Sequence, residues 1–279
     1  MPRFAANLSM LFAEHPFLER YAAAAQAGFG GVECWFPYDH DSAVVAELLE
    51  THGLQQVLIN APAGDWAAGE RGIGCHPARI SEFREGIDRA IDYAHAVGCR
   101  QINVLAGIAP EGVDAETIEG TLLANLRLAA KRMAERGLTL LLEPINTRDI
   151  PGYAVNRSAQ ALAILEAIGV GNTRLQYDCF HMQVMEGNLA QTIERHLERI
   201  GHIQIADNPG RGAPGSGEIN YGFLFDWLDR IGYTGWVSAE YLPGPDTRAS
   251  LGWLAPYLGE PDTLPAECRP YPDHQEDPA

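Results

Sequence analysis

The chain alternates short apolar runs with longer segments of helical period, and this alternation constrains its fold more than any other feature. Short apolar runs bounded by turn residues are typical of buried strands, and strands that alternate with amphipathic helices indicate βα units and a parallel sheet. The candidate strands are FAANLSM (4–10), GVECW (31–35), LQQVLINA (54–61), RQINVLAG (100–107), TLLLEPI (139–145), TRLQYDCF (173–180), GHIQIAD (201–207) and GWVSAEYL (235–242). Eight such strands predict an α/β protein with a single closed (β/α)8 TIM barrel.

The segments between the strands support this prediction. Amphipathic stretches occupy 16–28, 78–98 and 117–137. Several helices are expected to end in a left-handed glycine cap directly before the next strand, at Gly28, Gly53, Gly98 and Gly137. A doubly wound open sheet is the alternative, but no glycine-rich phosphate loop follows the first strand, so its nucleotide-binding versions are disfavoured.

Composition limits the organisation and the partners of the chain. With 279 residues, of which 46% are hydrophobic, it can bury one full core. We expect a barrel domain over residues 1–260 and a Pro-rich polar tail over 261–279, to which we assign no chemistry. The formal charge of −17 would repel phosphate backbones and anionic lipid, so we expect neither nucleic acid nor a membrane as a partner. A homo-oligomer remains possible, but no coiled-coil heptad repeat or apolar stripe indicates an interface.

Cysteine usage and the N-terminus indicate where the protein works. Its 5 cysteines include no CxxC pair, and their odd number suits a reducing compartment. The first residues do not read as a signal peptide, and no apolar run is long enough to span a membrane. We therefore expect a cytoplasmic protein.

Two loops that follow strands are longer than a barrel needs, namely 61–77 and 208–219. Long glycine-rich loops in this position act as lids over a site in some barrels and as plain surface connectors in others. The sequence leaves both readings open.

Glu143 raises the question of what compensates a buried charge, because it directly follows an apolar strand. Asp178, Gln204 and Glu240 also lie late in the three strands that follow. The carboxyl ends of barrel strands face one mouth, so these side chains should converge there. Carboxylates brought close raise one another's pKa values, and a divalent cation would remove that repulsion.

We therefore predict that these four residues, Glu143, Asp178, Gln204 and Glu240, bind a metal ion. The alternative is that each acid caps a helix or pairs with an arginine, but four consecutive strands share the feature. Carboxylate and amide oxygens without a histidine suit Mg²⁺ or Mn²⁺ better than zinc.

Further polar residues are expected near this mouth. His181, three residues after Asp178, is expected to bind a substrate oxygen, to serve as an extra ligand, or only to pack at a helix terminus. Arg211 lies in a glycine-rich loop from which a guanidinium can close over an anionic oxygen, although an exposed surface arginine is the alternative. Glu33, Asn60 and Arg71 should reach the same mouth, with weaker support.

The chain closely resembles the hydroxypyruvate isomerase family within the xylose isomerase-like barrels. The resemblance covers nearly all residues before about 259, and its most specific motif is HIQIAD…PGR…GEINY. The segments that carry it are NLSMLF (7–12), AGERGIGCHPARISEF (68–83), NVLAG (103–107), LLEPIN (141–146), LQYDCFHMQ (175–183) and HIQIADNPGRGAPGSGEINY (202–221). Ketose 3-epimerases of this group bind a divalent ion through Glu, Asp, His and Glu, whereas this chain has Gln204 at the His position, as the hydroxypyruvate isomerase branch does.

The resemblance implies a metal-assisted interconversion of hydroxypyruvate and tartronate semialdehyde, a small sugar-acid substrate pair, through an enediolate. The family's acid/base carboxylates correspond to Glu143 and Glu240, and its substrate-binding residues to His181 and Arg211. The alternatives with the same site are a 2-oxotetronate isomerase and a ketose 3-epimerase. A metal-dependent nuclease on this barrel would need more histidine ligands, and a sugar-acid binding protein would tolerate loss of a site carboxylate, of which none is lost.

Overall fold

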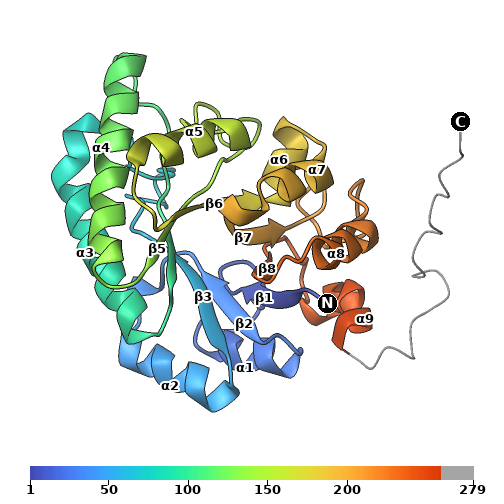
Figure 1. The fold of residues 1–279 in the computed structure, drawn as a ribbon. Helices are drawn as coiled ribbons and strands as arrows, with labels where there is room; N and C mark the ends of the chain where they lie inside the picture. Colours follow the sequence, from blue (N-terminus) through green and yellow to red (C-terminus); the bar gives the residue numbers. More distant parts are fainter. Residues whose placement is uncertain (259–279) are drawn as a thin grey trace, which may run out of the picture.

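Eight parallel strands close into a barrel in the order β1 to β8, and the helices lie outside it (Figure 1). The computed structural model describes residues 1–258. The strands are β1 (Arg3–Asn7), β2 (Gly31–Cys34), β3 (Gln55–Asn60), β4 (Gln101–Asn103), β5 (Thr139–Leu142), β6 (Thr173–Asp178), β7 (Ile200–Ile205) and β8 (Trp236–Ala239). The ring is closed by the parallel pairing of β1 with β8. The predicted (β/α)8 fold is confirmed.

The described helices include one for each of the three predicted amphipathic segments. They are α1 (Glu19–Gln26), α2 (Ser42–His52), α3 (Ile80–Ala96), α4 (Ala115–Ala134), α5 (Ser158–Ile168), α6 (Cys179–Met185), α7 (Leu189–Arg195), α8 (Tyr221–Arg230) and α9 (Ala255–Leu258). Asp41 and Asp114 begin α2 and α4 by accepting backbone N–H bonds from the first turn. The four glycines predicted to end helices all have positive φ, as at Gly53, where φ is 63°.

The strands are shorter than predicted, and β4 shows why. The predicted strand 100–107 ends at Asn103. Val104 N still donates to Leu141 O of β5, but the backbone oxygens of Leu105 and Ala106 accept from the loop 61–77. Cys75 N donates to Ala106 O at 2.8 Å in this loop contact. A Cβ on Gly72 would lie 2.6 Å from Leu105 O, so the close approach requires a glycine there.

The barrel interior changes from apolar to polar along the strands. Alternate residues of a strand share a face, so Ala5 lies on the same face as Asn7, and Leu141 on the same face as Glu143. At one end Ala5, Val57 and Leu141 pack with Trp236. At the carboxyl end the interior residues are polar and buried. The fold therefore places a polar layer at the mouth formed by the carboxyl ends of the strands and an apolar layer at the other end of the barrel.

Three other expectations concern parts of the chain away from this layer. No helix among residues 1–258 is both long and apolar enough to cross a membrane. The cysteines at 34, 75, 99 and 179 are buried and free. The predicted boundary at 260/261, the tail 261–279 and Cys268 lie outside the described residues.

Candidate active site

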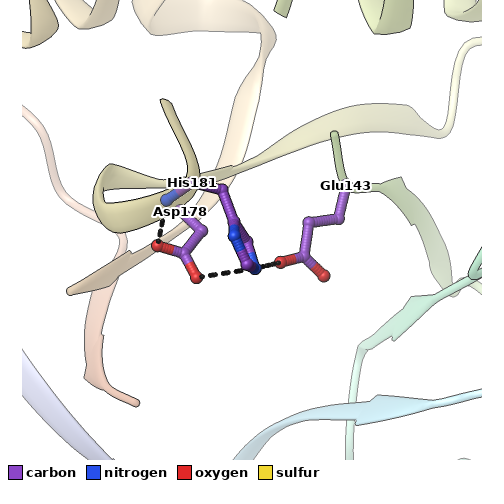
Figure 2. A group of neighbouring side chains, drawn as sticks. All are labelled: Glu143, Asp178 and His181. Atoms are coloured by element: carbon purple, nitrogen blue, oxygen red, sulfur yellow. Dashed lines mark hydrogen bonds and ion pairs between the residues drawn. The ribbon is translucent and has the colours of Figure 1, made fainter. Parts of the chain in front are cut away.

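The four predicted ligands all lie at the carboxyl ends of their strands. Glu143 directly follows β5, Asp178 ends β6, Gln204 lies in β7, and Glu240 directly follows β8. All four side chains are buried. Ligand atoms of Glu143, Asp178 and His181 lie within 4.8 Å of one another. Figure 2 shows the His181 ring between the two carboxylates.

Asp178 has one satisfied and one unsatisfied carboxylate oxygen. Its Oδ1 accepts the N–H groups of Phe180 at 2.7 Å and His181 at 3.3 Å, and so begins helix α6. Its Oδ2 is buried and has no hydrogen-bond partner. The nearest cationic atom is Arg211 Nη2, at 3.5 Å. A buried carboxylate oxygen without a donor is costly, and a cation between Asp178 and Glu143 would compensate it.

His181 is a neutral donor in this arrangement. Asn146 Oδ1 accepts the N–H of Asp149 at 2.8 Å, which fixes the amide so that Nδ2 faces His181 Nδ1 at 2.7 Å. Because Nδ1 accepts this bond, the ring proton lies on Nε2. Nε2 is 3.7 Å from Glu143 Oε1 and 3.6 Å from Asp178 Oδ2. Burial lowers the pKa of His181 to about 4, against the effect of Asp178. His181 therefore presents an N–H to the site.

Ionisation of Glu143 is unfavourable without a cation. Its Oε2 accepts from Asn103 Nδ2 at 2.9 Å and from Gln176 Nε2 at 3.0 Å. Burial raises the pKa of Glu143 well above its usual range, and repulsion by Glu240 and Asp178 adds to this effect. Glu143 therefore favours its protonated form unless a cation is near.

Glu240 is held by donors from three elements. Asn7 Nδ2 donates to its Oε1 at 2.8 Å, and Trp35 Nε1 donates to the same oxygen. Arg211 Nη2 donates to Oε2 at 2.6 Å. Burial raises the pKa of Glu240 to about 8, although Arg211 opposes the shift. A carboxyl group with this pKa can exchange a proton near neutral pH.

Arg211 reaches the site from the loop 208–219. Its backbone φ of 55° is unusual for a side chain of this size, and its carbonyl oxygen accepts the N–H of Leu242 at 2.8 Å. The loop is pinned by Asp207, whose buried carboxylate accepts backbone N–H groups from Asn208, Gly215 and Ile219. These contacts hold the guanidinium between Glu240 and Asp178.

Gln204 contacts polar side chains of the buried layer. Its Oε1 accepts from Gln176 Nε2 at 2.6 Å, and its Nε2 donates to Glu33 Oε1 at 2.7 Å. A carbonyl oxygen has two lone pairs, so Oε1 keeps one for a further partner.

The residues with weaker support lie in different places. Glu33 is buried in the polar layer. The backbone oxygen of Asn60 accepts from Tyr38. The guanidinium of Arg71 lies 4.2 Å from the Trp66 ring centroid, and the Trp66 ring contacts the ring of Trp35, which donates to Glu240.

Sequence reasoning missed the neutral residues that hold the carboxylates and His181. They are Asn7, Trp35, Asn103, Asn146 and Gln176, together with His202 beside Glu33. Only their position could have identified them from the sequence, because each lies in a strand or within four residues of the end of one. An amide alone at a strand end is too common to be read as part of a site.

Comparison with known proteins agrees with this architecture. The model of the family described as xylose isomerase-like TIM barrel matches residues 21–257. A 2-oxo-tetronate isomerase of Cupriavidus necator is 50% identical over 259 residues, which are 93% of this chain and 100% of that protein. A hydroxypyruvate isomerase of Escherichia coli is 51% identical over 257 residues, 92% of this chain and 100% of that protein.

A solved structure agrees closely in shape. A crystal structure described as AP endonuclease, family 2, from Brucella melitensis superposes with a TM-score of 0.89 at 47% identity, and covers 92% of this chain and 99% of that one. The chain belongs to the xylose isomerase-like TIM barrel family, and within it to the hydroxypyruvate isomerase family. It is an enzyme of the isomerase class.

Proposed function

We propose that the protein interconverts hydroxypyruvate and tartronate semialdehyde by proton transfer through an enediolate. The observation that carries this proposal is the pair of buried carboxyl groups with raised pKa values, Glu143 and Glu240, on either side of a neutral histidine and an arginine. The relatives at about half identity, named hydroxypyruvate isomerase and 2-oxo-tetronate isomerase, support it. The four-carbon oxo acid is the second candidate substrate, and a ketose is the third.

The residues present fit a divalent cation, Mg²⁺ or Mn²⁺. The fit rests on the buried Asp178 Oδ2 without a donor and on the raised pKa of Glu143. Glu143, Asp178, Gln204 and Glu240 would hold the ion through oxygen atoms, which these hard cations prefer. When bound, the ion supplies positive charge that stabilises the enediolate.

The chain's own carboxyl groups move the proton. One of Glu143 and Glu240 removes it from C3 of hydroxypyruvate, and the same or the opposite carboxyl group delivers a proton at C2. The hydroxyl proton moves from the oxygen on C3 to the oxygen on C2, so the product is an isomer of the substrate. Base catalysis of this kind contributes about two to four powers of ten in rate.

His181 and Arg211 bind the substrate in this proposal. The Nε2–H of His181 donates to a substrate oxygen, because Asn146 holds the ring in that tautomer. The guanidinium of Arg211 binds the substrate carboxylate and offsets the negative charge of the site, which is needed in a chain with a formal charge of −17.

The test is turnover of hydroxypyruvate by metal-stripped protein in D₂O, with Mg²⁺, Mn²⁺, Co²⁺ or Zn²⁺ added back. We expect isomerisation restored by Mg²⁺ or Mn²⁺, with solvent deuterium on carbon. Comparison of kcat/KM for hydroxypyruvate, 2-oxotetronate and ketoses then ranks the substrates. No turnover of any of them with any ion would overturn the proposed reaction, and full activity without metal would overturn the proposed ion.

We also propose that the enzyme works in the cytoplasm. The buried free thiols at Cys34, Cys75, Cys99 and Cys179 support a reducing compartment. Fractionation of cells that carry a tagged chain is the test.

A further inference from the structure

A continuous chain of buried hydrogen bonds runs beneath the site from Glu143 to Glu240. Gln176 Nε2 donates to Glu143 Oε2 at 3.0 Å and to Gln204 Oε1 at 2.6 Å. Gln204 Nε2 donates to Glu33 Oε1 at 2.7 Å. Asn7 Nδ2 donates to Glu33 Oε1 and to Glu240 Oε1, each at 2.8 Å. The proposed reaction gives no part to Glu33, which lies in the middle of this chain.

Glu33 is surrounded by donors on both oxygens. Its side chain is fully buried, its Oε1 accepts from Asn7 and Gln204, and its Oε2 lies 2.6 Å from His202 Nε2. A carboxylate accepts hydrogen bonds and donates none. Glu33 therefore presents only acceptor oxygens to Gln204. Only the NH₂ end of the Gln204 amide can face them favourably.

The partner on the other side of Gln204 imposes the same orientation. Gln176 directs its own NH₂ group at Gln204, so the carbonyl end of the Gln204 amide must face Gln176. A flipped Gln204 would set its oxygen against the carboxylate of Glu33 and its NH₂ against the NH₂ of Gln176. Both buried contacts would then join like groups, which leaves polar atoms unsatisfied.

This chain of hydrogen bonds holds side chains in place and does not carry protons. Its three intermediate donors, Asn7, Gln176 and Gln204, are primary amides. Their donors point outward from the amides to the acceptors, and an amide nitrogen does not readily take up a proton. A proton therefore has no path from Glu143 to Glu240 along this chain.

We propose that Glu33 is a positioning residue that keeps the carbonyl oxygen of Gln204 turned toward the cation. This inference rests on the proposed metal site. It gives Gln204 a ligand oxygen of defined orientation, where a freely rotating amide would offer its nitrogen equally often. Residues that orient metal ligands typically change metal affinity about 10- to 100-fold when they are replaced.

The test is a double-mutant cycle on Mn²⁺ affinity, measured as free Mn²⁺ by electron paramagnetic resonance. E33Q can turn its own NH₂ toward Gln204, so it no longer excludes the flipped amide of Gln204, while it keeps the shape of the side chain. We expect a dissociation constant at least about tenfold higher for E33Q than for the wild type. Q204M lacks the amide, so adding E33Q to Q204M should leave the dissociation constant within about twofold.

The cycle separates orientation from the loss of a nearby charge. A lost negative charge would weaken Mn²⁺ binding equally in the wild-type and Q204M backgrounds, and that result overturns the inference. Q56M is the matched control, because Gln56 is a buried amide in β3 that bonds to Leu58 O and Cys34 and lies outside the chain. Its Mn²⁺ affinity should equal that of the wild type.

Two further outcomes are distinguishable. If E33Q fails to fold by circular dichroism, E33D replaces it in the same cycle, and an effect that persists in Q204M again overturns the inference. If the wild type binds no Mn²⁺, the proposed metal site fails, and the inference fails with it. The kcat and KM of E33Q for hydroxypyruvate give a second readout: we expect kcat to fall more than KM rises.

Discussion

Glu33 and Glu143 are both buried glutamates of one barrel, yet their surroundings move their pKa values in opposite directions. Burial alone would raise the pKa of Glu33, but His202 and the amides of Gln204 and Asn7 lower it overall. Burial raises the pKa of Glu143 well above its usual range, and the neighbouring carboxylates add to this. Glu33 is thus a fixed acceptor, while Glu143 is a group that can change its protonation.

Replacing Glu143 by Gln should abolish turnover and stabilise the metal-free fold. The amide keeps the volume and one acceptor for Asn103 but cannot remove a proton. We expect kcat for hydroxypyruvate to fall by a factor of about 10² to 10⁴. Because Gln is neutral without taking up a proton, whereas Glu143 must bind one to be neutral in the buried site, the Tm of the metal-free protein should rise by several degrees, as is typical when a strained site residue is replaced. Steady-state kinetics and thermal melts measure both effects.

The matched control for this change is Glu194→Gln, because Glu194 is an exposed residue of α7. Its kinetics and Tm should equal those of the wild type. Near-normal turnover of Glu143→Gln would remove Glu143 from the proton path.

Arg211→Ala should raise KM for hydroxypyruvate by about tenfold or more, since a charge-assisted bond to the substrate carboxylate is lost. The guanidinium also lies 2.6 Å from Glu240 Oε2, so a fall in kcat is expected as well. Arg132→Ala, which removes a half-buried arginine paired with Asp88 on the outer helices, is the control and should leave both constants unchanged. Unchanged KM and kcat in Arg211→Ala would show that the loop arginine is peripheral.

At the scale of elements, the loop 208–219 behaves as a fixed arm. Besides its three bonds to Asp207, it donates from Glu218 N to Asn208 O at 2.7 Å. A Cβ on Gly217 would lie 2.3 Å from Asn208 O and 2.7 Å from Asp207 Oδ1, so the loop closes only with glycine at this position. The arm positions Arg211, and its geometry is therefore part of the site.

Gly217→Ala should displace this arm while it leaves the barrel folded. We expect kcat/KM to fall by about tenfold or more, because small displacements of a positioning group are costly in rate. Circular dichroism checks the fold and kinetics check the site. Gly222→Ala is the control, because its Cβ would meet nothing nearer than 3.7 Å in helix α8. That variant should keep full activity, and equal activity of Gly217→Ala would contradict a fixed arm.

The periodic parts of this architecture were accessible from the sequence, and the contacts between distant elements were not. Alternating apolar runs predict the strands, and a residue such as Glu143 stands out because an acid after a buried strand needs compensation. The strand ends were misjudged at β4, where the backbone turns to the loop 61–77. Asn7 and Gln176 could not be assigned, because an amide becomes part of a site only through partners far away in the chain, such as Glu240, 233 residues from Asn7.

At the scale of the whole molecule, the barrel holds several acids together at one mouth in a chain that is already strongly acidic. The closed ring of strands fixes the spacing of Glu143, Asp178 and Glu240, so they cannot move apart to relieve repulsion. That repulsion lowers the free energy of unfolding of the metal-free protein. A cation that binds only the folded state should raise the free energy of unfolding again, by the linkage between ligand binding and folding.

This linkage predicts how stability depends on pH. The pKa of Glu240 is about 8 in the folded protein and near 4.5 in an unfolded chain. Below about pH 4.5 the group is protonated in both states; between about 4.5 and 8 the folded state holds more protons, so stability falls as pH rises through this window. Glu240→Gln cannot titrate there. The Tm of the metal-free wild type minus that of Glu240→Gln should therefore decrease from pH 4.5 to 8, as thermal melts in EDTA can measure. Saturating Mg²⁺ favours the ionised carboxylates and should remove most of the decrease, whereas a difference in Tm that stays constant with pH would show that Glu240 is not held in its protonated form.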